Sequence, residues 1–291
     1  MARREPIVWG ARVLWLTLPV TAGWALGEAL SGRSSPVRVT AMAGAWGLWT
    51  VALVALLVPT TVSLTVARLL APAGLAVALA AAFGGASALA AGVATAHALV
   101  AAAAAFTAEF GQRFAQGSAY GDESRFPLRP PGWYVAGPVP LAWAFLAAAL
   151  GAGPLLAAAR QLIPGALLSA AGVAAAYPLG VRFHRLARRW VVVVPAGVVL
   201  HDHVALAETV MLPRADLVSI RLAPAGTAAT DLTVAALGLA LQIDLRSPAS
   251  LAVNGRRRTE VETVTAAALL VTPSRPGRVL EECRRRQFPV T

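Results

Sequence analysis

Five long apolar runs occupy the first 181 residues, and they constrain the fold more than any other feature. They cover residues 13–30, 41–66, 73–106, 141–159 and 162–181. A helix needs about 20 mainly apolar residues to cross the hydrocarbon core of a bilayer, which is about 30 Å thick. Hydrophobic residues make up 57% of the chain and charged residues 13%, whereas a soluble domain has about 45–50% and about 25%. The sequence therefore predicts a membrane α-helical bundle of about five transmembrane helices.

The third run, residues 73–106, is too long for one span and too short for two comfortable ones. At about 1.5 Å per residue it would form a helix roughly 50 Å long. We expect a single long helix, and the alternative is a break at Gly84-Gly85 that leaves a re-entrant piece and a full span. Pro59 is expected to kink the second run, and Arg68 and Pro72 to mark the turn that follows it.

Three ionisable side chains lie within or beside the apolar runs: Glu28, His97 and Glu109. An ionisable group in lipid is costly and is often functional. We interpret Glu28 as an interfacial residue and His97 as a hydrogen-bonded packing residue, because the run around His97 has no acidic partner before Glu109. The alternative is a transporter or a membrane-enzyme accessory subunit that uses these three groups.

Residues 107–140 form a long polar segment between the third and fourth runs. The segment combines charges of both signs with aromatic residues and turn formers. A loop of this length without secondary structure is more often functional than idle. We therefore expect it to contact a partner, through Arg113, Tyr120, Asp122, Glu123, Arg125, Arg129 and Trp133. The alternative is an amphipathic connector that lies at the membrane surface.

The hydrophobic pattern changes at Arg182–Trp190. From Trp190 onward, short β-rich runs alternate with turns, including a pair of strands around Gly238 and a last strand over residues 266–272. A final helix is expected after Ser274, which can cap it, with Val279, Leu280 and Cys283 on one face. Residues 182–291 are therefore predicted to form a soluble β-barrel or sandwich of about seven strands with a C-terminal helix.

The order of these elements resembles that of bacterial pleckstrin-homology-like (PH-like) domains, in which transmembrane helices lead into an Arg/Trp-led strand. The resemblance covers roughly residues 188–288, through the segments RRWVVVVPAGVVLHD, ADLVSIRL and TPSRPGRVLEECRRR. It implies a binding or assembly module in an actinobacterial inner-membrane protein. The first 181 residues depart from the short one-hairpin anchor of the commonest members. A Lys/Arg phosphoinositide signature is absent between the first strands, so headgroup binding by that signature is not implied.

Two groups of arginines could contact anionic lipid at the membrane surface. Each arginine near such a leaflet gains about 1 kcal/mol. For the second group, in the loop after Asn254-Gly255, a solvated loop is an equal alternative. The residues concerned are Arg182, Arg185, Arg188, Arg189, Arg256, Arg257 and Arg258.

Several kinds of function receive no support from the sequence. The net charge is +11, but no aromatic-basic platform or helix-turn-helix pattern accompanies it, so nucleic-acid binding is not expected. Cys283 is the only cysteine, which excludes a disulfide or a thiolate metal site within one chain. His201 and His203 share one face of a strand, but no third ligand lies at a suitable spacing. We expect no metal, cofactor or catalytic set.

The arginine distribution predicts the orientation of the chain in the membrane. With five spans and a cytoplasmic C-terminal domain, nine arginines flank the cytoplasmic side and five the other side. If residues 73–106 cross twice, both termini lie inside. We expect a bacterial plasma-membrane protein whose cytoplasmic PH-like domain and 107–140 loop dock another membrane or envelope protein.

Overall fold

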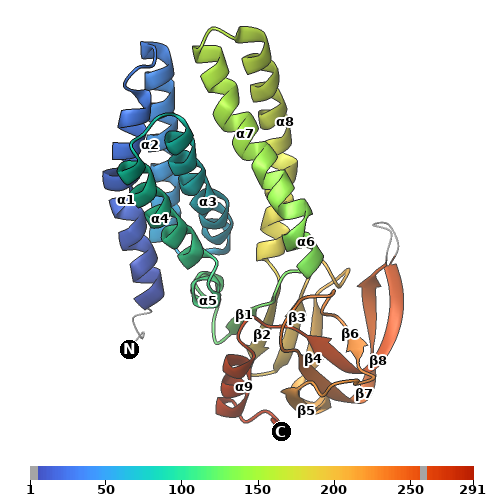
Figure 1. Ribbon diagram of the computed structural model, residues 1–291. Coiled ribbons are helices and arrows are strands. Elements are labelled where there is room, and N and C mark those ends of the chain that lie inside the picture. The colour runs from blue at the N-terminus through green and yellow to red at the C-terminus, as the bar shows by residue number, and fades with distance from the viewer. Residues whose placement is uncertain (1–5, 256–260) are drawn as a thin grey trace. The chain divides into compact units, whose positions relative to one another are not determined.

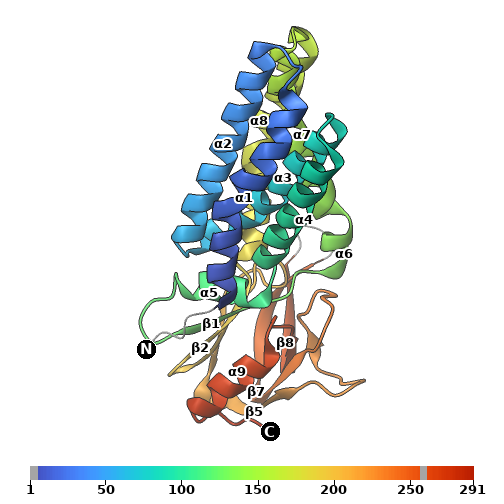
Figure 2. The same ribbon diagram turned by 60° about the vertical axis from the view of Figure 1, so that its left-hand side comes forward.

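The structure is a computed structural model that describes residues 6–255 and 261–291. The chain folds into two compact units. The helical unit comprises Met1–Phe114 and Pro140–Arg182, and the β unit comprises Ala115–Val139 and Phe183–Thr291. Both units can be followed along the chain in Figures 1 and 2.

Six helical segments among the described residues are long and apolar enough to cross a membrane, which indicates a multi-pass membrane protein. A short helix, α5, spans Ala108–Gln116, between the fourth and fifth of these segments. The six are α1 Pro6–Leu30, α2 Ser35–Leu57, α3 Thr61–Phe83, α4 Ala88–Ala105, the stretch Gly132–Ala158 with α6 Gly132–Ala136 and α7 Pro138–Ala158, and α8 Leu162–Ala187.

The prediction of five spans, with one long helix over residues 73–106, is wrong. Pro59 lies between α2 and α3 instead of kinking a helix, because proline and the residue before it both disfavour a continuing helix. Thr60 then caps α3, accepting a hydrogen bond from the Ser63 backbone N–H at 3.1 Å. As a result Arg68 and Pro72, expected in a turn, lie inside α3.

A second break separates α3 from α4. Gly84 ends α3, and Gly85 adopts a φ of 104°, a left-handed conformation that suits glycine. Ser87 caps α4 by accepting a hydrogen bond from the Ala90 backbone N–H at 3.3 Å. The glycine pair therefore separates two helices of spanning length, and not a re-entrant piece from a full span.

Helices α1 to α4 pack together, with α1 in contact with the other three (Figure 1). Two tryptophans join α1 to α2 by reciprocal hydrogen bonds. Trp15 Nε1 donates to the Trp49 carbonyl at 3.0 Å, and Trp49 Nε1 donates to the Trp15 carbonyl at 2.8 Å. Each indole N–H in this apolar setting is thereby satisfied.

Glycines allow α7 and α8 to approach each other closely. A Cβ at Gly165 would lie 2.5 Å from the Ala157 backbone nitrogen, and one at Gly172 would lie 2.9 Å from the Ala149 Cβ. Small residues at helix contacts replace the hydrophobic driving force that is missing between helices in lipid. The α7–α8 pair is thus a tight helical hairpin.

The β unit contains two four-stranded sheets and a C-terminal helix. Across the described residues the sheets stay open and form no closed barrel. The first sheet has the order β1 Ser124–Pro127, β2 Trp190–Val194, β3 Gly197–His201 and β4 Val210–Pro213. The second has the order β5 Leu217–Leu222, β7 Leu241–Asn254, β8 Val261–Val271 and β6 Thr230–Asp231, with a 3₁₀ turn at Arg214–Asp216 before β5.

Alternate residues of these strands fill one core between the sheets, and α9 (Pro276–Arg285) completes it. Val279, Leu280 and Cys283 are buried, as the helical spacing predicts. The expected cap at Ser274 is wrong. The residue before α9 is Arg275, which makes no capping hydrogen bond through its side chain, and Pro276 begins the helix.

The first strand of the β unit comes from the 107–140 segment. Residues 124–127 pair antiparallel with β2, with Phe126 opposite Val191 and Phe126 buried in the core. The α7–α8 hairpin is therefore inserted in the sequence between two neighbouring strands. The strand pair expected around Gly238 is confirmed only in part, since β6 and the start of β7 lie on either side of it but each pairs with β8. Residues 232–240 between them form a loop, in which Val234, Ala235 and Gly238 have φ of 54°, 57° and 116°.

Candidate functional site

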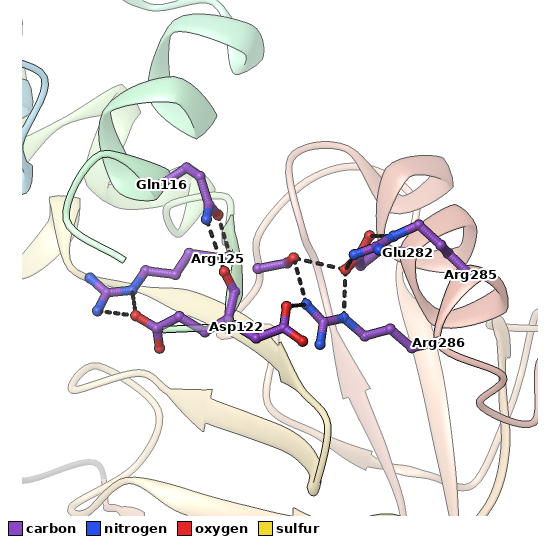
Figure 3. A network of polar contacts seen from close by, with 8 residues as sticks. Gln116, Asp122, Arg125, Glu282, Arg285 and Arg286 are labelled. Atoms are coloured by element: carbon purple, nitrogen blue, oxygen red, sulfur yellow. Dashed lines mark hydrogen bonds and ion pairs between the residues drawn. The ribbon is translucent and has the colours of Figure 1, made fainter. Parts of the chain in front are cut away.

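The predicted partner-contact segment forms an ionic network with α9 (Figure 3). Asp122 accepts a hydrogen bond from Arg286 Nη2 at 2.8 Å. Glu282 accepts hydrogen bonds from Ser124 Oγ at 2.8 Å and from Arg286 Nε at 2.6 Å. Arg285 adds a second guanidinium to Glu282. Because these groups satisfy one another, the network fastens residues 122–124 to the C-terminal helix.

The protonation of Glu282 follows from this geometry. Burial alone would raise the pKa of its carboxyl, but hydrogen bonds from Arg285, Arg286 and Ser124 outweigh burial and lower the pKa to about 2. Hydrogen bonding to Glu282 raises the pKa of Arg285. Burial opposes the charged form of Arg286, but its hydrogen bonds to Glu282 and Asp122 outweigh burial and raise its pKa. The network is thus charged at any physiological pH, and it has no group suited to proton transfer near neutrality.

A second set of contacts holds the turn before β1. Gln116 donates through Nε2 to the Glu123 carbonyl at 2.8 Å and accepts from the Arg125 backbone N–H at 2.9 Å. Glu123 and Arg125 form an ion pair at 2.6 Å. Asp122, Glu123 and Arg125, which we expected to contact a partner, are therefore engaged within the β unit.

The remaining predicted partner-contact residues are dispersed. Tyr120 and Trp133 are 91% and 56% exposed, and Arg113 is exposed on α5. Arg129 is half-buried, with its Nε buried and without a hydrogen-bond partner among the described residues. Arg113 belongs to the helical unit, whereas Tyr120, Arg129 and Trp133 belong to the β unit.

Arg189, expected at the membrane surface, is instead buried at 1% exposure. Its guanidinium makes a bidentate pair with Asp202, at 2.7 and 2.8 Å, and donates to the Arg129 carbonyl at 2.9 Å. Asp202 also accepts from the Val204 backbone N–H at 2.9 Å. A buried charge of this kind requires a close partner of opposite charge, so Arg189 is structural and unavailable to lipid.

The other predicted lipid-contacting arginines fall into two groups. Arg182 and Arg185 are exposed near the end of α8, and Arg188 is half-buried just after it. Arg256, Arg257 and Arg258 lie outside the described residues.

A stack of rings covers the outer face of the first sheet. The Trp190 and His201 ring centroids are 5.1 Å apart, and His201 lies 4.4 Å from His203. The Arg125 guanidinium lies 5.1 Å from the Trp190 ring. Burial, together with the nearby His203 and arginine charges, lowers the pKa of His201 to about 4. The imidazole is thus neutral near pH 7, and it donates to or accepts from Thr209 Oγ1 at 2.8 Å.

The two histidines do not form a metal site with Asp202, because Asp202 is committed to Arg189. Within residues 6–255 and 261–291, no group of three or more His, Cys, Asp or Glu side chains is suitably placed to bind a metal.

One further polar cluster, which the sequence did not reveal, lies on β5 and β7. Asp244 accepts hydrogen bonds from Ser219 Oγ at 2.5 Å, from Gln242 Nε2 at 2.6 Å and from Arg221 Nε at 3.2 Å. Burial opposes ionisation of Asp244, but these hydrogen bonds outweigh it and lower its pKa. A carboxylate with a lowered pKa is a poor base for activating Ser219, so the cluster does not form a nucleophile–base pair.

The single thiol is equally unsuited to chemistry. Cys283 is fully buried in the core between the sheets and α9. Burial, with the adjacent Glu282 carboxylate, raises its pKa to about 12. Since the thiolate is the nucleophile, this cysteine is inert at neutral pH.

Charged side chains of the helical unit bind the ends of neighbouring helices. Arg12 donates to the Leu56 carbonyl at the end of α2 at 2.9 Å. Arg68 donates to the Ala105 carbonyl at the end of α4 at 3.2 Å. Glu28 accepts from the Ser87 backbone N–H, at the start of α4, at 2.7 Å. Each charge has the sign that the helix dipole favours at that end.

His97 connects α4 to α1. Its Nε2 lies 2.9 Å from the Leu14 carbonyl and its Nδ1 lies 2.8 Å from Thr21 Oγ1. Because a carbonyl can only accept, Nε2 donates to Leu14, and Nδ1 shares a hydrogen bond with the threonine hydroxyl. Glu28 and His97 thus serve separate helix contacts, and Glu109 lies in the first turn of α5.

An apolar cavity of about 270 Å³ lies between α1, α2 and α3. Its lining includes Leu18, Met42, Trp46 and Val77, without a charged side chain. Such a lining fits an apolar chain and offers no group for specific polar recognition.

One edge of β8, which the sequence did not indicate, has few strand partners. Residues 249–254 of β7 pair with residues 261–266 of β8, and the hairpin extends past the other strands of its sheet (Figure 1). The far side of β7 is covered by backbone hydrogen bonds from Ala207 to Ala252 and from Asn254 to Ala205. Among the described strands, β6 alone pairs with the far side of β8, and only at Leu269 and Leu270. Within the part of the chain that the structure describes, residues 261–267 therefore form an open edge.

Comparisons of the chain with protein-family models, with curated proteins and with solved structures find no match.

Proposed function

We propose that the protein is a non-enzymatic bacterial plasma-membrane protein whose cytoplasmic PH-like β domain docks an extended segment of another membrane or envelope protein. The open edge of β8 between residues 261 and 267 carries this proposal. Unpaired strand edges present a row of backbone donors and acceptors that an added strand satisfies. Peptide recognition by strand addition uses this surface.

Six crossings and the positive-inside rule support the cytoplasmic side. With six spans, the N-terminus, the α2–α3 and α4–α7 connections and the β domain share one side. That side has eleven arginines in or beside the spans, and the other side has three. The eleven are Arg3, Arg4, Arg12, Arg68, Arg113, Arg125, Arg129, Arg182, Arg185, Arg188 and Arg189, and the three are Arg33, Arg38 and Arg160.

The PH-like identity of the domain rests on the order of its elements. Seven strands in two sheets follow α8, and an amphipathic helix closes the core. The 107–140 segment supports the docking role as part of this domain, to which it adds β1 and the ionic network. It is not proposed as a separate binding loop.

Site-specific photocrosslinking in living cells tests the proposal. A photoreactive amino acid is placed at Thr263 or Thr265 on the open edge, and at Met211 on β4, which is 41% exposed, as the matched control. We expect one discrete adduct with a membrane or envelope protein from both edge positions and none from position 211. No adduct, or the same adducts from all three positions, would contradict docking at this edge. An adduct with the mass of two copies of the chain would replace the proposed partner by self-association.

A further inference from the structure

Four exposed apolar side chains lie on two touching segments of the β unit, and we name them together the α6 patch. Trp133 and Val135 of α6 are 56% and 48% exposed, and Leu237 and Leu239 of the loop before β7 are 76% and 64% exposed. The two segments touch, since the Gly132 backbone N–H donates to the Ala235 carbonyl at 3.2 Å.

The loop is held firmly in the conformation that displays these leucines. A Cβ at Gly132 would lie 3.3 Å from Leu237 Cγ, and one at Gly238 would lie 2.8 Å from the Arg129 guanidinium carbon. Val234 and Ala235 both adopt left-handed φ values, which cost free energy for residues other than glycine. Leu237 and Leu239 are thus exposed, and not buried, on a loop whose backbone is strained.

Neither segment of the patch contains a charged residue, and the Arg129 guanidinium that packs against Gly238 is the charge that borders them among the described contacts. Residues 232–240 and 131–139 contain no Asp, Glu, Arg or Lys. Soluble surfaces rarely display a contiguous apolar group of this kind unless a partner or a membrane covers it. The aromatic pair Trp133 and Tyr134, with ring centroids 4.0 Å apart, is typical of the membrane–water interface, where amphipathic rings concentrate.

Chain connectivity identifies the surface that covers the patch. Gly137 alone separates α6 from α7, and the stretch Gly132–Ala158 is apolar enough to count as one candidate span. The end of α6 therefore cannot lie more than a few residues from the bilayer. We propose that the α6 patch inserts into the interfacial layer of the bilayer, so that the β domain contacts lipid through Leu237 and Leu239 as well as through its covalent connections. This contact does not involve the open edge of β8.

Depth-dependent fluorescence quenching tests this proposal on the full-length protein. Leu237→Cys and Leu239→Cys variants are labelled with a polarity-sensitive fluorophore and reconstituted into phosphatidylcholine nanodiscs. Val218→Cys on β5, where the native side chain is 50% exposed, is the matched control. The wild-type chain controls for background labelling, because Cys283 is fully buried. The Leu239 variant preserves the contact between Leu237 and Gly132, so it reports even if substitution of Leu237 disturbs the loop.

We expect blue-shifted emission at positions 237 and 239, with stronger quenching by nitroxides near the headgroups than by nitroxides at the chain ends. This corresponds to a depth of roughly 5–10 Å. The label at position 218 should emit as in water. Water-like emission at both leucine positions would overturn the proposal and leave the patch to a protein partner. A blue shift that appears only after phosphatidylglycerol is added would also overturn it, because arginine–lipid attraction would then bring the label to the bilayer.

Discussion

The two units of this protein neutralise their charged side chains in different ways. In the helical unit, Arg12, Arg68 and Glu28 each bind the backbone at the end of a neighbouring helix. In the β unit, charges pair with one another, as Arg189 does with Asp202. A helix end is an available partner in lipid because its unsatisfied backbone groups also need one. Sheets have only small net dipoles, so the β unit pairs side chain with side chain.

The largest effect on stability is expected when one member of the buried Arg189–Asp202 pair is removed. Arg189→Met would leave Asp202 buried without its cation, and we expect the β unit to lose about 3–5 kcal/mol of stability. Thermal unfolding of the full-length protein in detergent would measure the loss. The double variant Arg189→Met, Asp202→Leu should recover only part of it, because it removes the unpaired carboxylate but leaves the Val204 and Ala205 backbone N–H groups without their acceptor. A single variant as stable as the native chain would contradict this account of the pair.

In the helical unit, the corresponding test addresses packing instead of charge. Gly165→Ala places a methyl group 2.5 Å from the Ala157 backbone nitrogen, and we expect a loss of about 1–3 kcal/mol as α8 is pushed from α7. Gly180→Ala on the same helix meets nothing within 4 Å and should be neutral or slightly stabilising. Unfolding titrations from mild detergent into dodecyl sulfate would compare them. Equal effects of the two substitutions on stability would show that the close contact between α7 and α8 does not determine the stability of the helical unit.

The helix-end contacts predict a smaller effect. Arg68→Met removes the donor to the Ala105 carbonyl, and we expect a loss of about 1–2 kcal/mol. The same dodecyl sulfate titration applies, with the exposed Arg38→Met as the matched control. If Arg38→Met cost as much stability as Arg68→Met, general loss of positive charge would explain both results. The contact of Arg68 with the end of α4 would then not be responsible.

Two groups of the β unit make its stability depend on pH, and this dependence appears only below about pH 6.5. The pKa of His201 is lowered from 6.5 to about 4, so the unfolded state binds the proton more readily and stability falls as pH drops between these values. The pKa of Glu282 is lowered from 4.5 to about 2, so its contribution is complete above pH 4.5 and is lost toward pH 2.

The variants His201→Gln and Glu282→Gln separate the two contributions. The first should flatten the pH dependence of the unfolding midpoint between pH 6.5 and 4, and the second between pH 4.5 and 2. An unchanged pH profile in either variant would assign the titration to other groups.

The sequence predicts those features whose signals are local. Short β-rich runs were expected from Trp190 onward, and the first two, on either side of the Pro-Ala-Gly turn at residues 195–197, form the β2–β3 hairpin. The buried face of α9 is also confirmed, because helical spacing alone determines which residues share it. The two helix breaks at Pro59 and Gly85 also had local signals, but the continuous apolar character around them concealed the breaks.

Features that depend on distant partners could not be predicted in this way. Strand β1 pairs with β2 across the whole α7–α8 hairpin, and nothing within residues 124–127 specifies that partner. For the same reason Arg189 resembled a membrane-flanking arginine until the structure paired it with Asp202. The open edge of β8 is defined by the absence of a neighbouring described strand, which no residue pattern within β8 encodes.

The position of α7 and α8 between β1 and β2 has a consequence for biosynthesis. The ribosome releases β1 before the last two membrane segments, and the strand that completes its pairing follows both of them. The β domain therefore cannot close around Phe126 until the translocation machinery has received the whole hairpin. Folding of this domain would report that membrane insertion is finished, and a chain stalled between β1 and β2 would leave an unpaired strand for quality-control proteases to recognise.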